Sequence, residues 1–182
     1  MIFVTVGTHE QPFDRLIQKI DELKRDDVLQ EDVILQTGYS TYEPRYCQWR
    51  QFLPYGQMLK NVEAARIVIT HGGPGSILMP LRIGKIPIVV PRQSAFSEHV
   101  NDHQLEFVRA MERRQGNILI VEDVGLLKNT LLNYETIVQS MSAVLHPNNE
   151  QFLLAFGSIV DELFHVSTWK DALSRYLKEI EG

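Results

Sequence analysis

Short apolar runs rich in β-branched residues recur along the first two thirds of the chain, and segments with helical spacing of apolar positions separate them. Such alternation favours right-handed βαβ units and a parallel sheet covered on both faces. The runs predict strands over residues 1–6, 32–36, 51–55, 66–70, 86–90 and 118–121. The spacing predicts helices over residues 13–24, 56–65, 77–83 and about 98–114. We therefore predict a Rossmann-like, doubly wound α/β fold.

After Asp123 the pattern has only helical spacing, over residues 124–144, 150–164 and 169–180. We predict an α/β domain over residues 1–125 and a helical C-terminal extension over residues 126–182. A broad apolar stripe runs along residues 152–164. Two interpretations of this stripe stay open: it covers the chain's own sheet, or it docks a partner protein and self-associates without one.

The connection over residues 39–50 is aromatic and irregular, and it is predicted to be a loop. Loops of this length in a compact domain are often functional. Its aromatic side chains either stack on a sugar or lipid, or pack on the core. They are Tyr39, Tyr42, Tyr46 and Trp49.

Composition narrows the class of protein. The chain has 182 residues and a net charge of −5, which argues against general nucleic-acid binding. Cys47 is the only cysteine, so an internal disulfide framework is excluded. The sequence shows no signal peptide and no apolar run of membrane-spanning length, and we expect a cytoplasmic protein. No Asp or Glu lies between Glu63 and Glu98, where an anionic ligand is therefore expected.

The sharpest local feature is a glycine-rich turn over residues 71–76 (HGGPGS), between a predicted strand and a predicted helix. Its glycines are expected to adopt positive φ and to let a ligand approach closely. Free N–H groups at the helix N-terminus would then face an anion. The turn lacks the lysine of a P-loop, and Leu78 stands where a dinucleotide fingerprint has its third glycine. A plain packing turn is the alternative.

Several motifs together resemble the donor-binding half of GT-B glycosyltransferases, of the family 28 C-terminal type. The likeness spans residues 1–125 and extends to single-domain proteins related to the cytosolic catalytic subunit of the eukaryotic dolichol-linked N-acetylglucosamine transferase. Bacterial relatives of that group serve capsule and exopolysaccharide assembly. The motifs are FVTVGT (3–8), QTGYS (36–40), THGGPGSIL (70–78), GKIPIVVP (84–91) and NDHQ (101–104).

The resemblance implies a role for each matching residue. A first loop would face the diphosphate of a UDP-sugar, and Leu53 would offer backbone groups to uracil. His71 would be the catalytic residue that binds the pyrophosphate with the turn, and three residues further on would reach the sugar hydroxyls. No metal would be needed, because fixed dipoles stabilise the departing UDP. The first loop holds Gly7 and Thr8; the turn holds Gly72, Gly73, Gly75 and Ser76; the sugar contacts are Asp102, His103 and Gln104.

For several other residues the sequence leaves two or more roles open. Arg92 either pairs with phosphate or is an exposed surface arginine. His9 is either a general base or a polar loop residue. His99 and His103 are expected on one helix face, where zinc binding, sugar contact and plain exposure compete. Relatives carry a ribose-binding glutamate where this chain has Met79, and Glu98 is one candidate substitute.

The resemblance thus implies a UDP-sugar-dependent, inverting hexosyltransferase that acts on a lipid-linked saccharide in exopolysaccharide or capsule biosynthesis. A GT-B enzyme closes two halves around its substrates, and this sequence holds only the donor half. We therefore expect a membrane-anchored partner subunit that carries the acceptor half and recruits the chain to the inner membrane face. The rival interpretations are a non-catalytic UDP-sugar-binding regulatory subunit and a UDP-sugar epimerase relative.

Overall fold

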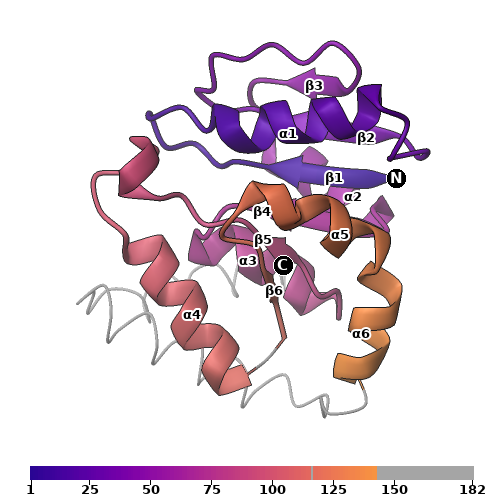
Figure 1. Ribbon diagram of the computed structural model, residues 1–182, viewed down its shortest axis with the longest axis vertical. Helices are drawn as coiled ribbons and strands as arrows, with labels where there is room; N and C mark the ends of the chain where they lie inside the picture. The colour runs from indigo at the N-terminus through magenta and orange to yellow at the C-terminus, as the bar shows by residue number, and fades with distance from the viewer. Residues whose placement is uncertain (116, 143–182) are drawn as a thin grey trace.

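In the described part of the chain, residues 1–115 and 117–142 of a computed structural model, six parallel strands form one sheet (Figure 1). The strand order β3-β2-β1-β4-β5-β6 winds outward from the centre in both directions, with a topological switch point between β1 and β4. The predicted Rossmann-like α/β fold is confirmed. The strands are β1 (Ile2–Thr5), β2 (Val33–Gln36), β3 (Gln48–Arg50), β4 (Ile67–Thr70), β5 (Ile88–Val89) and β6 (Leu119–Ile120).

Helices cover both faces of the sheet (Figure 1). The core clusters place α1, α5 and α6 on one face, and α2, α3 and α4 on the other. Because both faces are covered, the inner strands are apolar throughout rather than alternating. The helices are α1 (Asp14–Arg25), α2 (Tyr55–Ala64), α3 (Pro74–Arg82), α4 (His103–Gln115), α5 (Leu127–Leu132) and α6 (Tyr134–Ser142), with short 3₁₀ turns η1 (Ser94–Phe96) and η2 (Val124–Leu126).

The carboxyl ends of β2, β1 and β4 are in register, with Thr5 opposite both Gln36 and Thr70. A buried hydrogen-bond network fixes the loops that leave this edge. The Thr5 hydroxyl donates to Gln36 Oε1 at 2.6 Å, and Gln36 Nε2 donates to the carbonyls of Gly7 and Gln51. The chain segments that follow β1, β2 and β3 are therefore held together at one edge of the sheet.

Two predicted element boundaries were wrong. The third strand is residues 48–50, inside the predicted loop, and not residues 51–55. It is an edge strand whose outer residues are exposed, so it has no apolar run to reveal it. The helix predicted from residue 98 begins only at His103, because η1 and a bend occupy residues 94–102.

Two carboxylates of α1 hold the loop that precedes β3. Asp21 is buried and accepts hydrogen bonds from the Tyr42 hydroxyl and from three successive backbone N–H groups, at residues 45–47. Asp14 accepts from the backbone N–H groups of Thr41 and Tyr42. Tyr42 and Trp49 pack against the main core, whereas Tyr39 and Tyr46 are exposed. This segment is anchored rather than loose.

The C-terminal segment joins the main core as far as it is described. Leu127, Leu131 and Tyr134 pack with α1 and the sheet, and the Tyr134 hydroxyl donates to the Ile86 carbonyl at 2.6 Å. The helix predicted over 124–144 is instead interrupted at Asn133. The predicted helices at 150–164 and 169–180, and the docking surface assigned to them, lie outside the described residues. The division at residue 125 stays a prediction.

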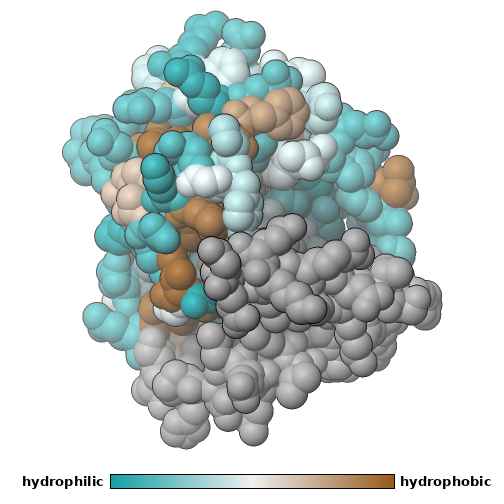
Figure 2. Space-filling view, turned by 180° about the vertical axis from the view of Figure 1, so that it is seen from behind, coloured by the Kyte–Doolittle hydropathy of each residue, from teal (hydrophilic) through white to brown (hydrophobic). Residues whose placement is uncertain are grey.

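The far side of the molecule from Figure 1 is mostly hydrophilic where it is described, with apolar residues reaching the surface in places (Figure 2). No helix among the described residues combines the length and the apolar character needed to cross a membrane.

Candidate anion-binding site at the carboxyl edge of the sheet

The glycine-rich turn lies directly after β4, at the switch point of the sheet, where open α/β folds bind their ligands. It leads into α3, a helix of nine residues. Among the described residues, the backbone N–H groups of Gly73 and Gly75 have no hydrogen-bond partner. The positive end of the helix dipole and these free donors suit an anion.

The imidazole of His71 lies between two glycines. A Cβ on Gly7 would be 2.5 Å from His71 Cε1, and a Cβ on Gly73 would be 2.3 Å from His71 Nε2. Gly7 also has φ +75, which disfavours any side chain there. The expected positive φ of the turn glycines was wrong, because Gly73 has φ −75 and the positive-φ glycines lie elsewhere. The turn needs glycine chiefly to make room for side chains.

The His71 imidazole has few polar neighbours in the described structure, and the backbone of Thr5 is one that acts on it. The His71 side chain is 8% exposed, and its Nδ1 is buried without a hydrogen-bond partner. Burial, reinforced by the positive charge of Arg92, lowers the pKa of His71 to about 3. The imidazole is therefore neutral at physiological pH and keeps hydrogen-bonding capacity for a ligand.

This low pKa makes a prediction about stability. Unfolded histidine has a pKa of 6.5, so between pH 6.5 and about 3 the unfolded chain binds a proton that the native His71 excludes. The contribution is complete above pH 6.5 and is lost as the pH falls, with a limiting slope of about 1.4 kcal/mol per pH unit. Urea unfolding at a series of pH values should show a shallower dependence in His71→Asn. Equal slopes would contradict the buried neutral imidazole.

Arg92 is not the exposed arginine of one sequence interpretation. It is fully buried, and its guanidinium donates to the carbonyls of Val6, Gln11 and Glu98. Burial lowers the pKa of Arg92 to about 10, so the group stays charged at neutral pH. Arg92 therefore ties the loop after β1 to the loop after β5. Its suggested phosphate contact stays a prediction, and among the described residues its buried Nε has no hydrogen-bond partner.

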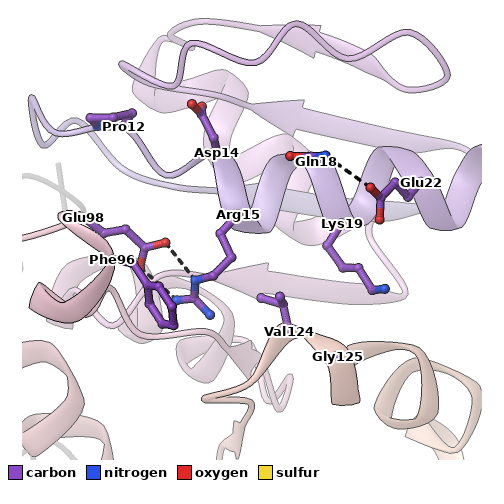
Figure 3. Close-up of a pocket in the computed structure, with 10 residues that line it drawn as sticks. All are labelled: Pro12, Asp14, Arg15, Gln18, Lys19, Glu22, Phe96, Glu98, Val124 and Gly125. Carbon is purple, nitrogen blue, oxygen red and sulfur yellow. Dashed lines mark hydrogen bonds and ion pairs between the residues drawn. The ribbon is translucent and has the colours of Figure 1, made fainter.

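Glu98 is committed to Arg15, at 2.8 Å from both Glu98 oxygens, and it also accepts from the Gln93 N–H. It is therefore no ready substitute for the missing ribose ligand. This ion pair borders a cleft of about 610 Å³ between α1 and the loops after β5 and β6 (Figure 3). Phe96 lies over the Arg15 guanidinium, with 4.6 Å from Cζ to the ring centroid.

The three residues expected to contact the sugar differ in burial and in hydrogen bonding. Gln104 is buried, its Cβ lies where a side chain on Gly72 would be, and its Oε1 accepts from the Arg92 N–H at 3.3 Å. Asp102 accepts from the backbone and hydroxyl of Ser94, and these two bonds lower the pKa of Asp102. His103 is exposed at the first position of α4.

The remaining candidates lie around the same edge. Thr8 and Gly75 are exposed, and Ser76 is half-buried in the first turn of α3. Leu53 is partly buried and packs against the cluster under α2, and Met79 packs against that same cluster. The position of the expected ribose-binding glutamate is thus part of an apolar contact.

Sequence reasoning missed a pair of neighbouring histidine rings, tilted by 36° to each other. The rings of His9 and His99 lie 4.5 Å apart between centroids, although 90 positions separate them in the chain. His99 lies in the bend before α4 and so does not share a helix face with His103. Within residues 1–115 and 117–142, no three His, Cys, Asp or Glu side chains could hold a metal ion together.

The fold and site thus define an open α/β domain with a glycine-rich turn and a helix N-terminus at its switch point. Residues 1–116 match the glycosyltransferase family 28 C-terminal domain. The chain belongs to this family, which confirms the resemblance seen in the sequence.

The chain is 34% identical over 84 residues to the UDP-N-acetylglucosamine transferase subunit ALG13 of Yarrowia lipolytica, covering 44% of this chain and 40% of that protein. The human protein of the same name is 34% identical over 121 residues, covering 62% and 10%. The glycotransferase of kitacinnamycin has the same fold, with a TM-score of 0.51 at 18% identity over 87% of this chain and 38% of that one. The chain thus covers less than half the length of these relatives.

Proposed function

We propose that the chain is the donor-binding, catalytic subunit of a glycosyltransferase. It transfers a hexose from a UDP-sugar to a lipid-linked saccharide, with inversion and without a metal, in exopolysaccharide or capsule biosynthesis. One observation carries the proposal. At the switch point of the sheet, N–H groups at the start of α3 lie beside a neutral His71, and neither they nor the buried His71 Nδ1 have a hydrogen-bond partner among the described residues.

These groups suit the leaving group of the reaction. Negative charge grows on the diphosphate as the bond from the sugar to UDP breaks, and prearranged N–H dipoles stabilise that charge. A neutral imidazole adds a further N–H donor without the cost of burying a second charge beside Arg92. Gln104 and the Gly7 loop close the site on two further sides.

The proposal includes a second subunit. The curated relatives are named as transferase subunits, and the chain covers less than half of their length. The family fold represents one half of a two-domain cleft, so we place the acceptor site and the general base on a membrane-anchored partner. The partner holds this cytoplasmic chain at the inner face of the membrane.

A transfer assay tests this function. Purified chain is incubated with a panel of radiolabelled UDP-sugars and a membrane fraction, with and without the product of the neighbouring gene. Label in the lipid fraction that depends on both proteins supports the proposal. Turnover that persists in His71→Ala, with UDP binding lost, would indicate a non-catalytic regulatory subunit instead. Conversion of a free UDP-sugar to its epimer would indicate an epimerase.

Nucleotide binding makes a sharper prediction. UDP should bind the chain by calorimetry in the presence of EDTA, because helix N–H groups supply the positive potential that a divalent ion would otherwise supply. Uridine should bind at least about tenfold more weakly, since it lacks the phosphate contacts. Binding that strictly requires Mg²⁺ would contradict the proposed donor set.

A further inference from the structure

The neighbouring rings of His9 and His99 have no role in the function proposed above. Both rings are partly buried, and they come from the loops after β1 and β5. Arg92 joins these two loops through carbonyls at residues 6, 11 and 98. The pair is therefore held in place by a buried scaffold, unlike two surface side chains that happen to meet.

Backbone contacts define which nitrogen of each ring carries the proton. Nδ1 of His9 accepts from the Gln11 N–H at 3.2 Å, and Nδ1 of His99 accepts from the Asn101 N–H at 3.3 Å. A neutral imidazole whose Nδ1 accepts must carry its proton on Nε2. Burial, then the nearby His99 and Arg92, lowers the pKa of His9, which favours this neutral form. Each ring thus offers an Nε2–H donor and no free acceptor nitrogen.

Charged groups of both signs surround the pair. Among the described residues Arg92 makes no ion pair: the carboxylate of Glu98 acts on it electrostatically but is bound by Arg15. Two other acids face the histidines: Glu10 is exposed, and Asp102 is bound to Ser94. Both rings also act electrostatically on the buried His71, which places them close to the start of α3.

Resting on the proposed function, we infer that His9 and His99 form a second phosphoryl subsite, in which two neutral Nε2–H donors bind the phosphate that lies next to the transferred sugar. His9 is then a binding residue and not the general base. The N–H groups of α3 bind one phosphate of the diphosphate, and the histidine pair binds the other.

Calorimetry at pH 7.5 with four probes tests the subsite: UDP, UMP, uridine and inorganic pyrophosphate. His9→Leu and His99→Leu should each weaken UDP and pyrophosphate at least about tenfold, which is the usual effect of losing a hydrogen bond to a charged group. Uridine should bind them as it binds the wild type. His9→Gln supplies an amide N–H donor and an acceptor oxygen but no base, so UDP binding should stay within about threefold.

Val100→Ala is the matched control, because Val100 is 77% exposed in the same bend as His99. It should bind all four probes as the wild type does, and melting temperatures report whether each variant is folded.

The outcomes separate this inference from the proposed function. Wild-type UDP affinity in both leucine variants would overturn the subsite and leave the UDP site standing. Histidine-dependent binding of pyrophosphate without UDP binding would support the subsite and overturn the proposed donor. If the wild type binds neither UDP nor pyrophosphate, both the subsite and the proposed function are overturned. A turnover loss of about a hundredfold in His9→Gln with UDP affinity retained would overturn the donor role, because that is the behaviour of a general base.

Discussion

Gly73→Ala should reduce UDP-sugar turnover at least about tenfold, roughly 1.4 kcal/mol of transition-state stabilisation. The added methyl would lie 2.3 Å from His71 Nε2, and the ring cannot retreat because Gly7 closes its other side. The imidazole must therefore leave its place beside the N-terminus of α3. His71→Ala removes the same group directly and should have a similar effect.

Two other glycines make this prediction specific. A methyl on Gly75 meets no described residue within 4 Å and leaves the Gly75 N–H in place, so Gly75→Ala should lose less than about threefold in turnover. Gly56→Ala, equally open in the first turn of α2, is a second comparison for turnover. Circular dichroism should show a native fold in all variants. Equal losses in Gly73→Ala and Gly75→Ala would show that the ring position does not matter.

Asp21→Asn should lower the free energy of unfolding by about 3 kcal/mol, measured by urea denaturation at pH 7. Both oxygens of the buried carboxylate accept two hydrogen bonds each. An amide replaces one acceptor oxygen by an NH₂ group that faces other donors, so the backbone N–H groups of the loop lose their partners. Asp14→Asn is the matched comparison, and its loss should be smaller because water can replace the carboxylate there.

The difference in stability between wild type and Asp21→Asn should depend on pH. Burial by itself raises the pKa of Asp21, but the hydrogen bonds from residues 42 and 45–47 outweigh it, and the pKa is below the ordinary 3.8. A depressed native pKa stabilises above pH 3.8, and this stability is lost as the pH falls through the native pKa. The difference between wild type and Asp21→Asn should therefore shrink below pH 3.8. A constant difference down to pH 2 would contradict the ionised carboxylate.

The histidine pair and the Asp21 anchor share a reason for escaping sequence analysis. Asp21 lies in an otherwise ordinary amphipathic helix, and its partners are backbone groups more than 20 residues away. His9 and His99 come from different loops. No local pattern distinguishes a carboxylate that binds backbone N–H groups from one that faces water, because the backbone carries the same groups at every position.

The sequence by itself determined the fold class, the alternation of strands and helices along the chain and the position of the glycine-rich turn. These follow from local causes: apolar runs form buried strands, spacing of 3.6 residues forms helices, and glycines mark the turn. The tertiary structure decided which glycines must stay glycines, because Gly7 and Gly73 are limited by the His71 ring and not by their own backbone alone. It also decided that Arg92 is a buried tie between loops, since burial depends on what the neighbouring loops cover. The tertiary structure also decided the position of the exposed edge strand β3. Its own residues show no apolar run, and its pairing with β2 defines it.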